Sequence, residues 1–225
     1  MYEERSKLNV KNQSMKRTAI IWNSPLLFSH LLSDCGYQCD EITPHLLAAP
    51  FFRGDFSLMV IPSGFGDSKY SCVLPALKAL SSRFKRYISR GGVLLLFGAV
   101  SERQDVYQWL VPGITYHFGF FDAEVTPFSS ESSSHPLLPI EYSSNQDGTR
   151  SNIYSLDGYL ICHEASIPYP IQVLATVLHP STHAQVPVFV RIPFEKGVVF
   201  ISTIHEYPTP AFLMGLIDPV QNTSF

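Results

Sequence analysis

Two short apolar runs on either side of one amphipathic segment constrain the fold more than any other feature of this sequence. The first run, Phe56–Pro62 (FSLMVIP), and the second, Val93–Phe97 (VLLLF), are almost continuously apolar. Such runs are typical of strands buried on both faces of a parallel sheet. Between them, apolar residues recur every three or four positions, which predicts one long helix that ends at Gly91-Gly92. These residues are Val73, Leu77, Leu80, Phe84 and Ile88.

The N-terminal part of the chain shows the same alternation. Thr18–Trp22 is a short, apolar run that predicts a strand, and Ser24-Pro25 is typical of the start of a helix. Gly36 predicts the end of this helix, and Tyr37–Ile42 reads as extended. Strands that alternate with helices through short links predict an α/β protein with a parallel sheet covered by helices on both faces.

Ligands in such sheets bind outside the carboxyl ends of the strands. The turns at those ends are Pro62–Gly66 and Phe97–Ser101, so we expect the site there. Backbone N–H groups of glycine turns can hold an anion, although the glycines also serve simply to allow tight turns. The predicted ligand-binding residues are Ser63, Gly64, Phe65, Gly98 and Ala99.

The second half of the chain is richer in predicted strands. Glu195–Gly197 predicts a hairpin turn between the last two strands, and Pro210–Leu216 predicts a closing helix. Ser129–His135 and Ser143–Asn152 read as polar loops. Because no linker divides the chain, we expect a flexible arm over residues 1–15 and a single domain over residues 16–225. The predicted strands are Tyr116–Phe121, Tyr159–Cys162, Ile171–Leu178, Val186–Ile192 and Val198–Ile204.

Composition excludes several classes of protein. With 225 residues, 45% of them hydrophobic and 16% charged, the chain is not a disordered one. A net charge of −3 disfavours nucleic acid as a partner, and the absence of a long apolar run predicts no membrane span. The four cysteines are sparse and the N-terminus lacks a secretory signal, which predicts reduced thiols and a cytoplasmic protein. No cofactor is indicated, and a homo-oligomer stays open.

Three segments resemble the class I glutamine amidotransferase-like superfamily: Phe56–Gly64, Ile88–Ala99 and Lys196–Pro208 (KGVVFISTIHEYP). The second resembles the double glycine and strand that lead to the family's nucleophile elbow, and the third resembles the segment that carries its catalytic His and Glu. The resemblance implies a flavodoxin-like three-layer sandwich with a central, mainly parallel sheet. The β-rich C-terminal part is then an elaboration of that fold.

The resemblance also implies what this chain lacks. Active amidotransferases hold a nucleophilic cysteine at the elbow, where this sequence has Gly98, so we expect no glutaminase activity. His205 and Glu206 match the catalytic His and Glu, but the family usually separates the two by one residue. Since neighbouring side chains on a strand point to opposite faces, Glu206 is not expected to orient His205 as the family's Glu does.

Three hypotheses of function follow. The first is a domain without catalysis that binds a small molecule or a protein partner at the strand ends. The second is an enzyme resembling the ThuA-like branch that acts on a carbohydrate or related small molecule, with His205 as acid or base. The third is a metal-dependent hydrolase, although no metal-ligand spacing supports it; its candidate ligands are His163, Glu164, His179, His183 and His205.

Two further features have an ordinary reading beside a functional one. Ser101 follows the elbow and could act as a displaced nucleophile, but a serine there is more typical of a cap. The aromatic segment Trp109–Phe121 could line a sugar or partner surface, although filling of the core is the more common role for such residues.

Overall fold

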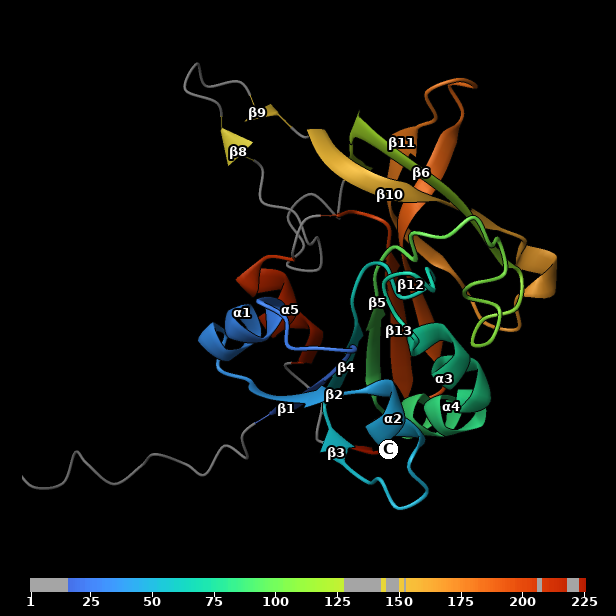
Figure 1. Ribbon diagram of the computed structural model, residues 1–225. Coiled ribbons are helices and arrows are strands. Elements are labelled where there is room, and N and C mark those ends of the chain that lie inside the picture. Colours follow the sequence, from blue (N-terminus) through green and yellow to red (C-terminus); the bar gives the residue numbers. More distant parts are fainter. Residues whose placement is uncertain (1–15, 128–142, 145–149, 152, 206–207, 218–222) are drawn as a thin grey trace, which may run out of the picture.

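The computed structural model describes residues 16–127, 143–144, 150–151, 153–205, 208–217 and 223–225. Its main feature is a sheet of eight strands (Figure 1). The first five strands in the sheet order are parallel to one another, and each of the last three runs antiparallel to the strand before it. The order is β2 (Gln38–Ile42), β1 (Arg17–Ile21), β4 (Leu58–Ile61), β5 (Val93–Leu96), β13 (Gly197–Ser202), β12 (Gln185–Phe194), β11 (Gln172–Leu178) and β7 (Thr126–Pro127).

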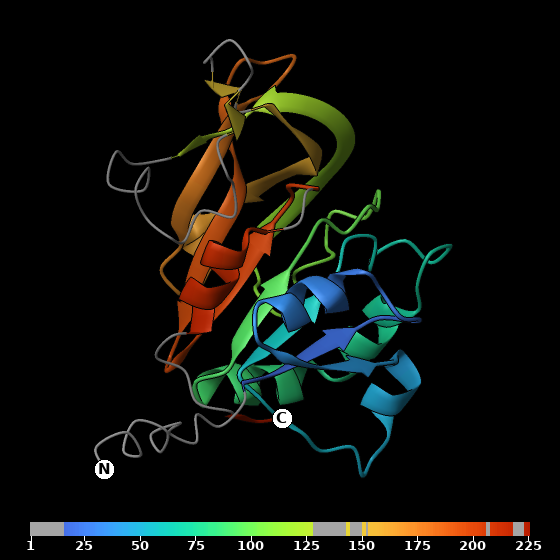
Figure 2. The ribbon, with the colours of Figure 1, turned by 90° about the vertical axis from the view of Figure 1, so that its left-hand side faces the viewer.

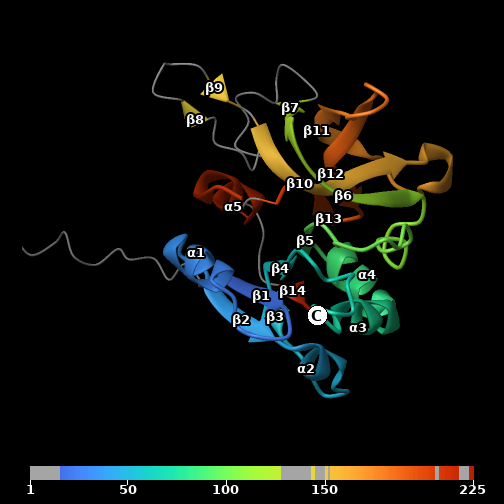
Figure 3. The same cartoon turned by 45° about the horizontal axis from the view of Figure 1, so that its top comes forward.

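Helices cover both faces of the parallel strands (Figure 3). On one face lie α1 (Phe28–Asp34) and α5 (Pro210–Ile217), whose apolar residues share one buried cluster with β1, β4 and β5. On the other face lie α2 (Pro44–Ala48), α3 (Val73–Ala79) and α4 (Ser81–Ser89), which contribute to a second buried cluster. The predicted mixed α/β class and mostly parallel sheet are therefore confirmed.

A long antiparallel ribbon, β6 (Ile114–Glu124) and β10 (Ile153–Cys162), lies above the carboxyl ends of the parallel strands (Figure 2). It is joined to the segment after β13 by a bridge between Leu156 and Ile204. The remaining regular elements are short: the strand pairs β3 (Asp55–Phe56) with β14 (Thr223–Ser224) and β8 (Ser143–Ser144) with β9 (Arg150–Ser151), and the 3-10 helix η2 (Glu164–Ser166).

The predicted long helix over Val73–Ile88 is wrong in one respect, since it divides at Leu80 into α3 and α4. Leu80 has φ −104° and ψ 14°, and two serines, Ser81 and Ser82, follow it. Serines of this kind favour caps and bends over helix interiors. Both halves still direct the predicted apolar stripe at the sheet, so the periodicity identified the buried face but not the break.

The start of the first helix was also predicted wrongly. Ser24 does not cap it: α1 begins at Phe28, after Leu27, which forms no side-chain cap. The predicted end is confirmed, because Gly36 has φ +85°, a conformation that glycine adopts without strain. The helix α2 was not predicted, although Thr43 accepts a hydrogen bond from the Leu46 N–H and Pro44 follows it, as in a typical helix start.

Several expectations concern residues outside the described ranges. These are the arm over residues 1–15, the loop Ser129–His135, most of the loop Ser143–Asn152, and Glu206. Among the described helices, none is both long and apolar enough to cross a bilayer.

Candidate functional site

The two turns that the sequence predicted as the site lie against each other. The Gly64 N–H donates to the Gly98 carbonyl at 2.8 Å, and the Gly66 N–H donates to the Ala99 carbonyl at 2.9 Å. Because these turns follow β4 and β5, the bonds join the carboxyl ends of two neighbouring parallel strands. The predicted proximity of the two turns is confirmed.

The same bonds limit what the turns can offer to a ligand. The N–H groups of Gly64 and Gly66 are engaged by backbone carbonyls, and the side chains of Phe65 and Ala99 are fully buried. Ser63 is the predicted residue with a polar side chain, and its hydroxyl lies 3.1 Å from the Gly98 carbonyl. Direct ligand binding by this set of five residues stays a prediction.

The structure adds Asp157 to the site, from strand β10. The pairing of β10 with β6 shifts register between Leu156 and Gly158: the single β10 residue Asp157 lies opposite two β6 residues, Gly119 and Phe120, which is a β-bulge in β6. Bulges locally bend and twist the paired strands, and they are common beside functional sites. The Asp157 backbone is fixed by a bond from its N–H to the Thr203 carbonyl (2.8 Å) and by the Tyr116 hydroxyl, which donates to the Asp157 carbonyl.

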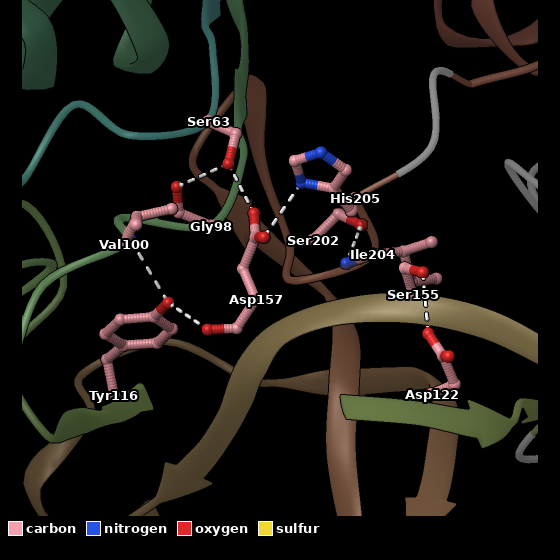
Figure 4. A network of polar contacts seen from close by, with 10 residues as sticks. All are labelled: Ser63, Gly98, Val100, Tyr116, Asp122, Ser155, Asp157, Ser202, Ile204 and His205. Carbon is pink, nitrogen blue, oxygen red and sulfur yellow. Dashed lines mark hydrogen bonds and ion pairs between the residues drawn. The ribbon is translucent and has the colours of Figure 1, made fainter. Parts of the chain in front are cut away.

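The Asp157 carboxylate is fully buried and bonded at both oxygens (Figure 4). Oδ2 accepts from the Ser63 hydroxyl, and Oδ1 lies 2.8 Å from Nδ1 of His205. A carboxylate accepts hydrogen bonds, so this partner identifies Nδ1 as the protonated nitrogen of the ring. Nε2 is then left for other partners, and the His205 side chain is 57% exposed.

Asp157 also explains why the elbow position carries no side chain. A Cβ built on Gly98 would lie 2.4 Å from Oδ2 of Asp157 and 2.5 Å from its Cβ. Both distances are far inside van der Waals contact. The space that a nucleophile at Gly98 would need is therefore occupied by the Asp157 side chain.

The three polar side chains do not form a Ser-His-Asp triad. In a triad the histidine lies between serine and carboxylate and takes the serine proton. Here Asp157 lies between Ser63 and His205, so the Ser63 hydroxyl bonds the carboxylate rather than the imidazole. The arrangement can orient the His205 ring and present Nε2 for acid–base chemistry or for ligand binding.

Two buried tyrosines, Tyr107 and Tyr116, form hydrogen bonds with the backbone around the site. The Tyr116 hydroxyl accepts from the Val100 N–H at 3.2 Å, and the Tyr107 hydroxyl donates to the Phe97 carbonyl at 2.8 Å. Burial raises the pKa of Tyr116, and the Asp157 charge raises it further, so the phenol stays protonated. Val100 has φ +51°, a strained conformation for a β-branched residue that the surrounding bonds maintain.

Tyr116 also lines a pocket of about 310 Å³ between the β6–β10 ribbon and the turn after β11. His117 stacks on Tyr159 with 4.9 Å between ring centroids, and His179 meets the same tyrosine edge-on. Burial lowers the pKa of His117, and the neighbouring His179 lowers it further.

The predicted aromatic segment Trp109–Phe121 therefore has two roles. Trp109 and Tyr116 are buried in the core, Phe118 and Phe121 line the pocket, and Phe120 is exposed.

The remaining sequence candidates are not brought together. Within the described part of the chain, no three His, Cys, Asp or Glu side chains are placed to share a metal ion. Nδ1 of His179 accepts from the N–H groups of Ser181 and Thr182, which is a local turn. Ser101 accepts from the Arg103 N–H in a local turn, and no helix follows for it to cap among the described elements. The four cysteines are unpaired thiols.

Asp157 is the residue that the sequence analysis missed. The signal was present, since Asp157-Gly158 interrupts an apolar run, and an Asp-Gly pair inside a strand pattern indicates a turn or bulge. Nothing in the sequence alone, however, shows that this part of β10 meets the ends of β4 and β5.

Comparisons with known proteins show similarity of fold. No family model matches the chain, and no curated protein sequence matches it. Cytoplasmic Protein STM3548 from Salmonella typhimurium is similar over 92% of this chain and 100% of that one, with 13% identity and a TM-score of 0.51. The cold-adapted β-galactosidase from Rahnella sp. R3 is similar over 90% of this chain, with 12% identity and a TM-score of 0.50. This chain spans 30% of that enzyme and 30% of a β-galactosidase from Bacillus circulans sp. alkalophilus (TM-score 0.48, 14% identity).

Proposed function

We propose that this chain is a glutamine amidotransferase-like domain without glutaminase activity, which binds a small molecule or a protein partner at the carboxyl ends of its strands. The observation that carries the proposal is the Asp157 carboxylate in the corner above Gly98. It fills the nucleophile's place and leaves the exposed edge of His205 as the polar group available to a ligand.

The fold supports this proposal. The parallel strands follow the order β2-β1-β4-β5-β13, which is the order of flavodoxin-like sheets, in which ligands bind at the strand ends. Helices on both faces complete the three layers of that architecture. The likeness to a part of a β-galactosidase supports the same fold and carries no activity to this chain. The unpaired thiols favour a cytoplasmic location.

Nuclear magnetic resonance tests the binding proposal directly. The protein is titrated with L-glutamine, D-galactose and D-glucose while the His205 ring and the Ser63 and Gly98 amide signals are followed. We expect at least one probe to shift these signals together, and we expect His205→Ala to abolish the shift. His183→Ala is the matched control, because His183 is an exposed histidine in the turn after β11. Shifts that persist in His205→Ala would place the ligand elsewhere.

Glutaminase activity has its own test. We expect no ammonia release from L-glutamine above the blank. Release that is lost on replacement of one of the four cysteines would show that the chain has a nucleophile outside the elbow.

The second candidate is an enzyme of the ThuA-like kind that acts on a carbohydrate, and the bond between Asp157 and His205 favours it. A carboxylate bonded to Nδ1 fixes the tautomer and the orientation of the imidazole and presents Nε2, as a general base requires. The aromatic pocket beside Tyr116 adds stacking surfaces suited to a sugar ring.

Deuterium exchange separates the enzyme from the binding domain. Aldoses and ketoses are incubated with the protein in D₂O, and loss of the C–H signal next to the carbonyl is followed. An enzyme with His205 as base should catalyse this exchange and lose it in His205→Gln, with Asp157→Asn lowering the rate. A binding domain should give none. The metal-dependent hydrolase gains no support from the described geometry, since its candidate ligands do not converge.

A further inference from the structure

A second pocket lies at the opposite, amino end of the parallel strands. It has a volume of about 500 Å³. In Figure 1 the elements around it, α2, α4 and the C-terminus, lie at the lower edge, away from the β6–β10 ribbon. Its floor is largely aromatic, with Phe52, Tyr87 and Phe225. Four of the chain's nine arginines line it: Arg53, Arg83, Arg86 and Arg90.

Three of these arginines come from one helical surface. Arg83, Arg86 and Arg90 are three and four positions apart along α4 and its C-cap, so they share a face of the helix. Arg53 joins them from the loop before β3. Favourable interaction with the helix C-terminus accounts for arginines in the last turn of α4, but it does not account for Arg53.

The Arg83 guanidinium is held in place. Its Nη2 donates to the Phe52 carbonyl at 2.8 Å, and its Cζ lies 4.5 Å from the centre of the Phe225 ring. Burial lowers the pKa of Arg83, and the charges of Arg86 and Arg53 lower it further. The fold therefore concentrates like charges around a group that is already partly desolvated.

No ion pair among the described residues balances these charges. Among the described residues, none of the four arginines forms an ion pair. By contrast, the two arginines of the described chain that do form ion pairs, Arg17 and Arg103, each have an aspartate partner. Grouped guanidinium groups without counter-charges are suited to bidentate recognition of phosphate oxygens.

We propose that this pocket binds a small organic phosphate, with the phosphate groups on the arginines and the organic part on the aromatic floor. The volume lies within the usual range of about 300–1,000 Å³ for small-molecule sites. Arg83 is preorganised by Phe52 and Phe225, so part of the ordering cost is met before the ligand arrives. The site is distinct from the His205 site, because the two lie at opposite ends of the same strands.

Isothermal titration calorimetry with inorganic pyrophosphate and with ATP tests this proposal. Ionic strength is held constant with NaCl, and circular dichroism checks the fold of each variant. We expect saturable binding of one ligand per chain that weakens as NaCl is raised. The double variant Arg86→Gln/Arg90→Gln should bind at least about tenfold more weakly, as expected when charge-assisted bonds are lost.

Two controls make the outcome specific. Lys85→Gln removes one positive charge from the same helix without touching the pocket, and it should change the affinity less than about twofold. His205→Ala should leave it unchanged, so this site can be tested independently of the proposed function. Equal loss in Lys85→Gln and the double variant, or no binding of either probe, would overturn the proposal. Binding of heparin or RNA without saturable pyrophosphate binding would also overturn it, because the surface would then be a polyanion patch.

Discussion

The two ends of the parallel strands treat charge in opposite ways. At the carboxyl end, one buried carboxylate, Asp157, is bonded to Ser63 and His205 and excludes any side chain from the elbow. At the amino end, four guanidinium groups gather around an open pocket, and none of them is in an ion pair with a described residue. The first arrangement is internally satisfied, whereas the described residues give the second no ion-pair partner, a role that a ligand could fill.

This difference predicts how substitutions at each end of the strands change the stability of the protein. Removing a partner from Asp157 leaves a buried charge or hydrogen-bonding group unsatisfied, which is costly. Removing one arginine from the amino end relieves repulsion between like charges. Substitutions at the carboxyl end should therefore lower the stability, and those at the amino end should raise it. The stability changes at the two ends should also differ in size.

Gly98→Ala should have the largest effect. Its Cβ would lie 2.5 Å from the Cβ of Asp157, and the Asp157 backbone cannot withdraw because Thr203 and Tyr116 bind it on both sides. We expect a loss of about 3 kcal/mol in the free energy of unfolding, measured by urea denaturation. Gly119→Ala is the matched control, since nothing lies within 4 Å of a Cβ there.

A double-mutant cycle identifies the cause of that loss. Asp157→Ala would keep the clashing Cβ, so Asp157→Gly is the variant that makes room. In the Asp157→Gly background, Gly98→Ala should cost less than about 1 kcal/mol. An equal cost in both backgrounds would mean that Gly98 is required for another reason.

Asp157→Asn should have the second-largest effect on stability. It keeps the volume of the side chain and removes its charge. The bonds to the Ser63 hydroxyl and to Nδ1 of His205 would weaken, with an expected loss of about 2 kcal/mol. Asp122→Asn is the control, since this exposed aspartate accepts from Ser155 on the same ribbon (Figure 4). It should cost less than about 0.5 kcal/mol. Similar losses in both variants would remove the distinction between the buried and the exposed carboxylate.

Arg53→Gln should change stability in the other direction. The pKa of Arg83 is lowered by burial and by the charges of Arg86 and Arg53, which means that the fold disfavours the charged form of Arg83. Removing the Arg53 charge should stabilise the protein by up to about 0.5 kcal/mol at low salt, and the gain should vanish at high salt. Lys69→Gln, an exposed lysine outside the pocket, should give no gain. Destabilisation by Arg53→Gln would contradict the idea that these charges repel.

The sequence predicted the carboxyl end of the parallel strands better than the amino end. Periodicity and apolar runs located β1, β4, β5 and the buried face of α3 and α4, because burial on known faces leaves a regular pattern. The same argument placed the Pro62–Gly66 and Phe97–Ser101 turns together, which the Gly64–Gly98 bond confirms.

What the sequence could not predict depends on contacts between distant segments. Asp157 reaches Gly98 because the part of β10 opposite the β6 bulge meets the end of β5, and neither segment shows the other in its own pattern. The arginine pocket likewise needs Arg53 beside α4, and the sequence of α4 alone shows Arg83 and Arg86 only as polar positions between apolar ones. The break at Leu80 was missed because both halves keep one apolar stripe.

The smallest effect is expected at Asp105, a surface carboxylate between two cations. It is intermediate between the buried Asp157 and the arginines of the second pocket. Asp105 accepts from Arg103 and Lys78, which lower its pKa from 3.8 to about 2. Because the pKa is lowered in the folded state, the stabilisation is fully present above about pH 4 and is lost as the pH falls towards 2. The Asp105 side chain is 45% exposed, so solvent screening keeps the contribution at about 0.3 kcal/mol. Asp105→Asn should therefore lower stability slightly at pH 7, with the difference from the wild type shrinking between pH 4 and pH 2 in denaturation measured across pH. A difference that stays constant over that range would show that the ion pairs contribute nothing, and that Asp105 acts only through the shape of its turn.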